Sequence, residues 1–547
     1  MVAHKLVWEV LRRRDGNAGR PPFTPIKAVK IAVLSGLLLQ CFLPEILPMA
    51  SEPRVLRVAG ALLLTLGLAV AVAARVQLGR NWSNVESATV LPGQQLVSAG
   101  QYRHIRHPIY IGDILLVAGY EMALNSWLWL MVIPLTVFVW RKAAQEEALL
   151  ESGLDGYAGY LKTSGRFFPR NAAVGVAAAA IAFSIQFANV QVNFNGNWSG
   201  VFCAGRAFPA PAYLHHEKLF VFPHSGYDGQ FYHYIAHDPW PSERTARSID
   251  VPRLRYTRIL VPALSYVVAL GQQDWIDPSF HAISLLAFGL GAWWLACYAS
   301  LTGANRYWGL AFLLIPAVLI SLDRSTVDVM FLAFCCGFSY YAARASSAGI
   351  YAVIVLATLN RDTGFLLWGA YGLHLLINRR WTRAGIFGTA ALPAVAWHLI
   401  VRANTQADFP SLGLATSAHA IWDHLLKPAH YEFPSQIANL AVALDYVSLA
   451  GVALAIVLVL VRVFREYDNP SVLAAAAFVA LPFTVGGHLA WHDPFAYPRT
   501  LSPMLLFLGL AAMKSRSWLG YVPLLLVLPR ILMELAGRLP FLRGLLH

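Results

Sequence analysis

The feature that most constrains this chain is the recurrence of apolar runs from Ala28 almost to the C-terminus. As a helix, a run of roughly 20 residues crosses a hydrocarbon core of about 30 Å. The composition agrees, because 57% of the 547 residues are apolar and only 13% are charged. Between these runs there is no room for a soluble domain of ordinary size. The sequence therefore predicts an all-α, polytopic transmembrane protein with roughly 14 to 15 spans in two modules.

The charges and cysteines exclude several other classes of protein. The net charge is +13, but the basic residues stand in short clusters between apolar runs and form no continuous basic face. We interpret them as topology signals and expect no nucleic-acid partner. The five cysteines are scattered or adjacent, without the spacing of a metal site or a disulfide framework. We assign no metal ligand from the sequence.

The basic clusters also predict the orientation in the membrane. Arg12 to Arg14 precede the first apolar run and place the N-terminus in the cytoplasm. That run lacks a convincing cleavage site, so we expect a retained span and not a signal peptide. Counting spans onward makes the stretch from Gly79 to Pro108 cytoplasmic and exports the loop from Gln191 to about Arg258. Between them, Pro108 can begin a helix, and Asn125 with Ser126 interrupt the apolar pair from Ile109 to Trp140, which predicts a helical hairpin. The apolar run at 259–271 is too short to cross completely.

Two polar strings in the first third of the chain carry a recognisable pattern. Residues 78–112 read LGRNWSNVESATVLPGQQLVSAGQYRHIRHPIYIG, and residues 145–170 read QEEALLESGLDGYAGYLKTSGRFFPR. They resemble LVxxGxYRxxRHPxYxG and EExLLxxxxxxYxxYxxxxxRFxP of the isoprenylcysteine carboxyl methyltransferase and phospholipid methyltransferase family. The resemblance covers residues of about 28 to 170. It implies a membrane methyltransferase domain over 1–170 that binds S-adenosylmethionine.

The resemblance implies roles for particular side chains at this cytoplasmic boundary. Arginine and histidine can meet the cofactor carboxylate or a substrate anion, and glutamates can accept hydrogen bonds from its amino or ribose groups. The implied cofactor-binding residues are Tyr102, Arg103, His107, Pro108, Tyr110, Gly112, Glu146 and Arg166, and the implied catalytic residues are Arg106 and Glu147. Taken singly, each charged residue could instead anchor a helix end in lipid head groups or lie on a solvated helix face.

The methyl acceptor is left open by the sequence. A charged cofactor that reaches a lipid or prenyl-type substrate must bind where membrane meets cytosol, and the basic cluster beside an apolar hairpin supplies such a boundary. A carboxylate or thiolate acceptor needs little more than alignment with the donor. An amine acceptor would also need a base.

The rest of the chain carries a second resemblance. The exported loop contains SGYDGQFYHYIAHDPW at 225–240 and RLRYTRILVPAL at 253–264. With the preceding span, these strings resemble membrane glycosyltransferases of the GT-C class, which use polyprenyl-phosphate sugars. The resemblance implies a glycosyltransferase-like domain over 171–547, with a polyprenyl-phosphate sugar as second donor and a lipid-linked substrate.

The GT-C resemblance maps the base or acceptor-positioning acid onto Asp228. A lipid phosphate leaving group needs fixed cations, for which the candidates are Arg253, Arg255, Arg258, Arg361 and Arg499. Asp228 could instead be a turn residue and the arginines a snorkelling helix end. No second acid follows Asp228 at metal-pair spacing, so metal dependence stays open. The alternatives for this module are a transporter or a non-catalytic scaffold, with only the methyltransferase active.

Overall fold

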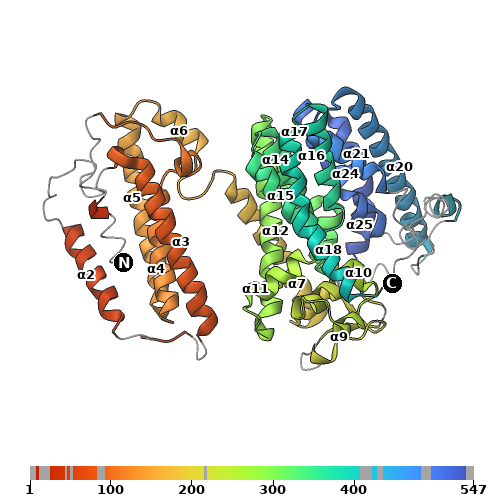
Figure 1. The fold of residues 1–547 in the computed structure, drawn as a ribbon, viewed down its shortest axis with the longest axis horizontal. Helices are drawn as coiled ribbons and strands as arrows, with labels where there is room; N and C mark the ends of the chain where they lie inside the picture. The colour runs from red at the N-terminus through yellow and green to blue at the C-terminus, as the bar shows by residue number, and fades with distance from the viewer. Residues whose placement is uncertain are drawn as a thin grey trace. The chain divides into compact units, whose positions relative to one another are not determined.

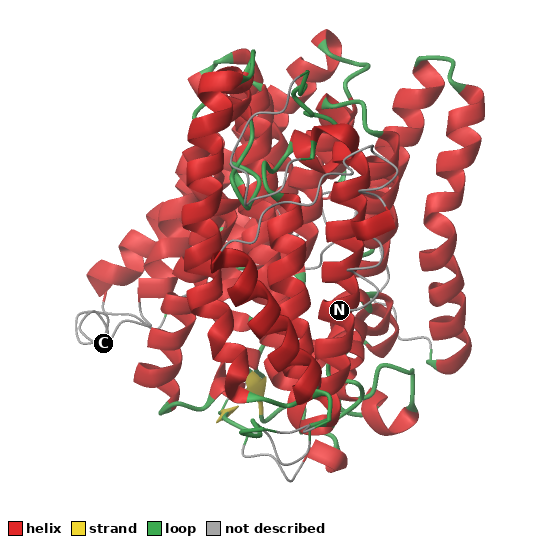
Figure 2. Cartoon of the chain, turned by 90° about the vertical axis from the view of Figure 1, so that its left-hand side faces the viewer, coloured by secondary structure: helices red, strands yellow, loops and turns green. Residues whose placement is uncertain are grey.

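The computed structural model describes residues 8–10, 25–42, 46–49, 53–82, 93–214, 219–223, 225–406, 422–427, 431, 435–481 and 495–536. Arg12 to Arg14, on which the predicted orientation depends, lie outside this range. The chain divides into two compact units, Met1–Ala173 and Val174–His547 (Figure 1). The described residues are mostly helical, with two short strands (Figure 2).

Unit 1 is built around a helical hairpin. Its helices are α2 (Pro25–Gln40), α3 (Arg54–Leu78), α4 (Pro108–Ala123), α5 (Val132–Gly153) and α6 (Tyr157–Thr163), with short 3-10 turns η1 (Gly79–Asn81), η2 (Gly100–Arg103) and η3 (Trp127–Met131). Helix α4 begins at Pro108, as predicted, because the missing amide proton costs nothing in the first turn. The chain reverses at Asn125, which has a φ of 56°, and Ser126 caps η3. The predicted hairpin break at these two residues is confirmed.

Glycines let α3 and α4 pack backbone against backbone. A Cβ on Gly60 would lie 2.3 Å from the Ala123 nitrogen, and one on Gly119 would lie 2.3 Å from the Leu64 nitrogen. Gly112 is constrained in the same way, since its Cβ would lie 2.6 Å from the Ala71 nitrogen. Small residues at helix contacts are typical of membrane helices, where close packing drives association.

Unit 2 contains the remaining elements. They are α7 (Ala172–Phe194, which begins at the unit boundary), η4 (Trp198–Phe202), β1 (Ala204–Gly205), η5 (Ala212–Leu214), β2 (Val221–Phe222), α8 (Gly229–His237), α9 (Glu243–Ala246), α10 (Pro252–Thr257), α11 (Leu260–Val268), α12 (Gln273–Leu301), η6 (Arg306–Leu314), α13 (Pro316–Arg324), α14 (Asp328–Ala343), α15 (Ser347–Asn360), α16 (Gly364–Ile377), α17 (Trp381–Gly388), η7 (Thr389–Ala391), α18 (Leu392–Asn404), α20 (Ser435–Arg465), α21 (Pro470–Val479), α24 (Ala496–Ser515), η8 (Trp518–Tyr521) and α25 (Val522–Ala536).

The core of unit 2 is an apolar bundle. Phe280 of α12, Phe338 of α14 and Phe507 of α24 are all essentially inaccessible to solvent and belong to one contiguous cluster. The strands β1 and β2 pair in parallel, Ala204 with Val221 and Gly205 with Phe222. They lie in the segment between α7 and α8 that carries the polar loop of this unit.

The membrane-crossing helices are fewer than the apolar runs. Among the described residues, 7 helices are long and apolar enough to span a membrane, or 8 if the bent pair η6 and α13 counts as one span. We expected 14 to 15 from the sequence. Four further apolar helices, with 10 to 17 residues each, account for part of the difference. Helix α11, with 9 residues, is too short to cross a membrane, in line with the expectation for 259–271. The protein is an all-α, multi-pass membrane protein.

Candidate functional site

The two polar strings of unit 1, far apart in sequence, meet at a short parallel bridge between Ile105 and Gly165. The Arg106 amide donates to the Gly165 carbonyl oxygen at 2.8 Å, and the His107 amide donates to the Arg166 carbonyl oxygen at 3.1 Å. The residues just before α4 are thereby fixed against the segment that follows α6. This backbone pairing brings the implied site residues of both strings together.

Glu147 is the centre of a buried ion cluster. Its Oε1 accepts from Arg106 Nε at 2.8 Å and lies 3.1 Å from His107 Nε2. Its Oε2 accepts from Arg166 Nη2 at 2.7 Å. Both oxygens are therefore occupied, and the side chain is only 7% exposed. This arrangement makes Glu147 an organiser of Arg106, His107 and Arg166.

The guanidinium of Arg106 is also hydrogen-bonded within unit 1. Besides Glu147, its guanidinium donates to the backbone oxygen of Ser164. Arg166 lies over the Trp140 ring at 4.8 Å and is 23% exposed, so its guanidinium is shared between the ion cluster, an aromatic face and the surface. The hydrogen bond to Glu147 raises the pKa of Arg166 further, which keeps it charged at any physiological pH.

Glu146, one residue earlier, is placed differently. Its Oε2 accepts from the Tyr110 hydroxyl at 2.8 Å and lies 3.7 Å from His107 Nδ1. The His107 and Tyr110 rings stack with centroids 5.3 Å apart. At 37% exposure the Glu146 carboxylate can still accept hydrogen bonds from a ligand. Glu146 is therefore the more accessible carboxylate of this cluster, beside the buried His107 and the half-buried Tyr110.

The other implied residues of unit 1 have varied surroundings. Arg103 is exposed, whereas Tyr102 is buried and its carbonyl oxygen accepts from the Tyr160 hydroxyl at 2.5 Å. Burial, assisted by the Glu146 carboxylate, raises the pKa of Tyr102 above its ordinary value and keeps the phenol neutral. Pro108 begins α4, and Gly112 faces α3, so the structure gives these two residues packing roles.

In unit 2 the predicted acid is held by two arginines. Asp228 immediately precedes α8, and its Oδ2 lies 2.8 Å from Arg255 Nη1 and 2.6 Å from Arg499 Nη2. Burial alone would raise the pKa of Asp228, but the two guanidinium groups outweigh it and hold the pKa well below its ordinary value. Asp228 is therefore ionised at physiological pH.

The remaining arginines of unit 2 are also paired. Arg258 Nε lies 3.1 Å from Asp362 Oδ2, and Arg258 Nη1 donates to the Tyr232 hydroxyl at 2.8 Å. Arg361 contacts Asp328, which also lies 3.7 Å from Arg499 Nε. Arg255 pairs with Asp250 at 2.6 Å as well as with Asp228. The structure brings four of the five predicted arginines into carboxylate pairs.

Arg253 is the exception. Its Nη2 donates to the backbone oxygens of Thr405 at 2.9 Å and Arg402 at 3.4 Å, at the end of α18. Among the described residues, the carboxylates that balance the other arginines are Asp228, Asp250, Asp328 and Asp362. Three of these counterions were not foreseen from the sequence. The cluster is therefore close to charge-balanced.

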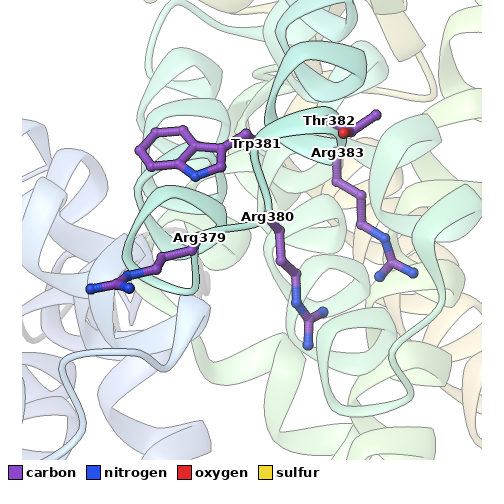
Figure 3. Close-up of a pocket in the computed structure, with 5 residues that line it drawn as sticks. All are labelled: Arg379, Arg380, Trp381, Thr382 and Arg383. Carbon is purple, nitrogen blue, oxygen red and sulfur yellow. The ribbon is translucent and has the colours of Figure 1, made fainter.

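A separate basic hollow of about 520 Å³ lies between α16 and α17 and is lined by Arg379, Arg380, Trp381, Thr382 and Arg383. All five residues are exposed, and the three guanidinium groups point in different directions (Figure 3). Divergent, solvated arginines beside a tryptophan are typical of a helix end at the membrane interface. This hollow has no converging groups for catalysis.

Comparison with known proteins bears on unit 1. Residues 55–153 match the model of a family described as Phospholipid methyltransferase. The match covers α3, α4 and α5 and includes His107, Glu146 and Glu147, but it stops before Arg166. No curated protein and no solved structure matches the chain. The match supports a membrane methyltransferase in unit 1.

Proposed function

We propose that unit 1 transfers a methyl group from S-adenosylmethionine to a lipid or prenyl-type substrate at the cytoplasmic face of the membrane. The observation that carries the proposal is the meeting of the two family-like strings at the Ile105–Gly165 bridge, within a unit whose helices match the phospholipid methyltransferase model. The partly exposed Glu146 carboxylate, beside His107 and Tyr110 at one end of the apolar hairpin, supports the proposal.

The residues of unit 1 fit such a cofactor by the chemistry of their donors and acceptors. Glu146 can accept hydrogen bonds from amino or ribose hydroxyl groups, and the exposed Arg103 can meet a carboxylate. When bound, the cofactor supplies an electrophilic methyl group. Glu147 holds Arg106, His107 and Arg166 in place and so positions the wall of the site. Tyr110 orients Glu146 through its hydroxyl.

The test compares two glutamates of the same helix. Membranes or purified protein receive methyl-labelled S-adenosylmethionine with total lipid extract, and label in the lipid phase is counted. Glu146→Gln removes a charge-assisted hydrogen bond, so we expect roughly a tenfold or greater loss of cofactor affinity. Glu151→Gln, an exposed change on α5, should leave affinity unchanged. Absence of cofactor binding and of labelled lipid with the wild-type protein would refute the proposal.

A second candidate function concerns unit 2, namely transfer of a sugar from a polyprenyl-phosphate donor. The observation in its favour is the buried, ionised Asp228 at the start of α8, held by Arg255 and Arg499. Both arginines contact Oδ2, and no hydrogen bond of Oδ1 is found among the described residues. Asp228 Oδ1 can therefore accept a hydrogen bond from an acceptor hydroxyl. The lowered pKa favours a positioning role, because such a carboxylate is a weak base.

The test of the second function follows hexose transfer from a polyprenyl-phosphate sugar to membrane lipids by mass spectrometry. Asp228→Asn should lower sugar transfer on the order of a hundredfold, because a misplaced acceptor costs about that much, and should leave methyl transfer intact. Asp468→Asn, an exposed carboxylate between α20 and α21, is the matched control. Normal sugar transfer by Asp228→Asn would refute the positioning role of Asp228. Absence of transfer by the wild-type protein would favour a non-catalytic scaffold role for unit 2.

A further inference from the structure

A histidine pair and an aspartate converge in unit 2, outside both sites above. His233 and His237 are four residues apart on α8, and Gln273 and Asp277 are four residues apart on α12, so each pair lies on one face of its helix. His233 Nε2 is 2.8 Å from Asp277 Oδ1, and His237 Nε2 is 3.1 Å from the same oxygen. Two imidazole nitrogens from one helix thus meet one carboxylate oxygen from another.

The hydrogen bond between His237 and Gln273 defines which ring nitrogen of His237 faces Asp277. His237 Nδ1 is 2.6 Å from Gln273 Oε1, which only accepts, so Nδ1 carries the proton. The amide orientation is supported by Gln273 Nε2, which donates to the His237 backbone oxygen at 3.5 Å. In a neutral imidazole, Nε2 then presents a lone pair to the Asp277 carboxylate. Two lone pairs facing each other at 3.1 Å would repel, so either a proton or a metal ion lies between them.

We propose that His233, His237 and Asp277 bind a divalent transition metal ion, and that zinc is the ion this ligand set favours. Two imidazoles and one carboxylate form a known three-ligand set for zinc, with a fourth position left for water. In a tetrahedral site with bonds of about 2.0 Å, ligand atoms lie roughly 3.3 Å apart. The three ligand atoms here all lie within 4.8 Å of one another, so small side-chain movements complete the geometry.

The surroundings of the cluster have the features of a metal site. Gln273 fixes the tautomer of His237, as the outer hydrogen-bond partners of metal-bound histidines commonly do. The His233 ring stacks on Phe202 with centroids 4.2 Å apart, which limits its rotation. Both histidines are buried, whereas the Asp277 side chain is 25% exposed and provides a route for the ion.

The structural consequence of the metal ion is a link between α8 and α12. Helix α8 begins directly after Asp228, so a link at His233 and His237 also fixes the segment that carries this acid. Metal binding should therefore raise the thermal stability of the protein, because the ion binds the folded state and a preformed site is absent from the unfolded chain. This inference stands independently of either proposed activity.

The test uses the full chain, purified in detergent with an affinity tag that contains no histidine. After removal of metals with a chelator, the protein is titrated with zinc and with cobalt(II), whose visible absorption bands report tetrahedral coordination. We expect about one equivalent of zinc per chain, strong cobalt bands and a higher unfolding temperature with zinc. His237→Gln and Asp277→Asn should lose all three properties, whereas His374→Gln on α16 should keep them.

A milder variant tests the proposal even if the ligand variants fail to fold. Gln273→Ala leaves the three ligands in place but removes the partner of His237 Nδ1, so zinc affinity should fall roughly 10- to 100-fold while the protein remains folded. Less than half an equivalent of zinc on the wild-type protein, or equal zinc affinity in wild type, His237→Gln and Gln273→Ala, would overturn the proposal. In that case a proton on His237, and not a metal ion, bridges it to Asp277.

Discussion

Replacement of Glu147 by glutamine should destabilise unit 1 without removing any group that a cofactor can reach. Glu147 bonds Arg106 and Arg166 and lies against His107, at distances of 2.7 to 3.1 Å. Each of the two arginine pairs is worth about 6 kcal/mol in gross Coulomb energy at an effective dielectric constant near 20, before desolvation is subtracted. Loss of one partner of a buried ion cluster costs about 3 to 5 kcal/mol net. For a domain of this size, that is roughly a 10 °C fall in unfolding temperature.

The assay must report on unit 1 specifically. Hydrogen exchange followed by mass spectrometry can monitor the amides of Arg106 and His107, which bond to Gly165 and Arg166 across the bridge. In Glu147→Gln these amides should lose protection together with the fall in unfolding temperature, whereas Glu146→Gln should lose cofactor affinity and keep protection. Wild-type protection in Glu147→Gln would show that the bridge does not depend on the ion cluster, and the division of roles between the two glutamates would be wrong.

Other predictions test packing, ion pairs and pH dependence. Gly119→Val should destabilise the hairpin by on the order of 1 to 3 kcal/mol in thermal unfolding, because a Cβ there would lie 2.3 Å from the Leu64 nitrogen; a neutral result would contradict the close α3–α4 contact. In the same assay, Arg255→Ala should lower the free energy of unfolding by about 3 to 5 kcal/mol, and Arg253→Ala by less than about 0.5 kcal/mol. Equal losses in the two variants would contradict the pairing of Arg255 with carboxylates. Arg255 and Arg499 lower the pKa of Asp228 despite its burial. The ionised Asp228 therefore contributes its full share of stability above the unfolded-state pKa of about 3.9, and this share is lost only as the pH falls through the lowered folded-state pKa. A titration of sugar transfer should accordingly show no Asp228-dependent acid limb between about pH 5 and 8.

Much of the architecture could be predicted from the sequence because it depends on local chemistry. The apolar runs predicted helices, Pro108 predicted the start of α4, and Asn125 with Ser126 predicted the reversal of the hairpin. The number of spans could not be predicted as well, since an apolar run that is buried inside a bundle has the same composition as one in lipid. Helix α14 is of this kind, since most of its 16 residues are buried.

The partners of charged groups were the part that local patterns could not supply. Asp328 and Asp362 become counterions only when distant helices meet, whereas Asp250 lies five residues before its partner Arg255. The same limit applies to α8, where the histidine spacing in YHYIAH is visible in the sequence but Asp277 lies 40 residues beyond His237. Ion pairs across a fold depend on tertiary contacts, and a single sequence does not record them.

The two adjacent glutamates of α5 show how the structure assigns roles that a motif leaves equal. Successive residues on a helix are about 100° apart, so Glu146 and Glu147 cannot face the same surroundings. Glu147 has both oxygens occupied by cations and is buried, whereas Glu146 has one bonded oxygen and is partly exposed. A carboxylate whose oxygens both accept hydrogen bonds inside the protein is poorly placed to accept one from a ligand. By the same criterion, Asp228 can meet a substrate through Oδ1, while its Oδ2 is committed to Arg255 and Arg499.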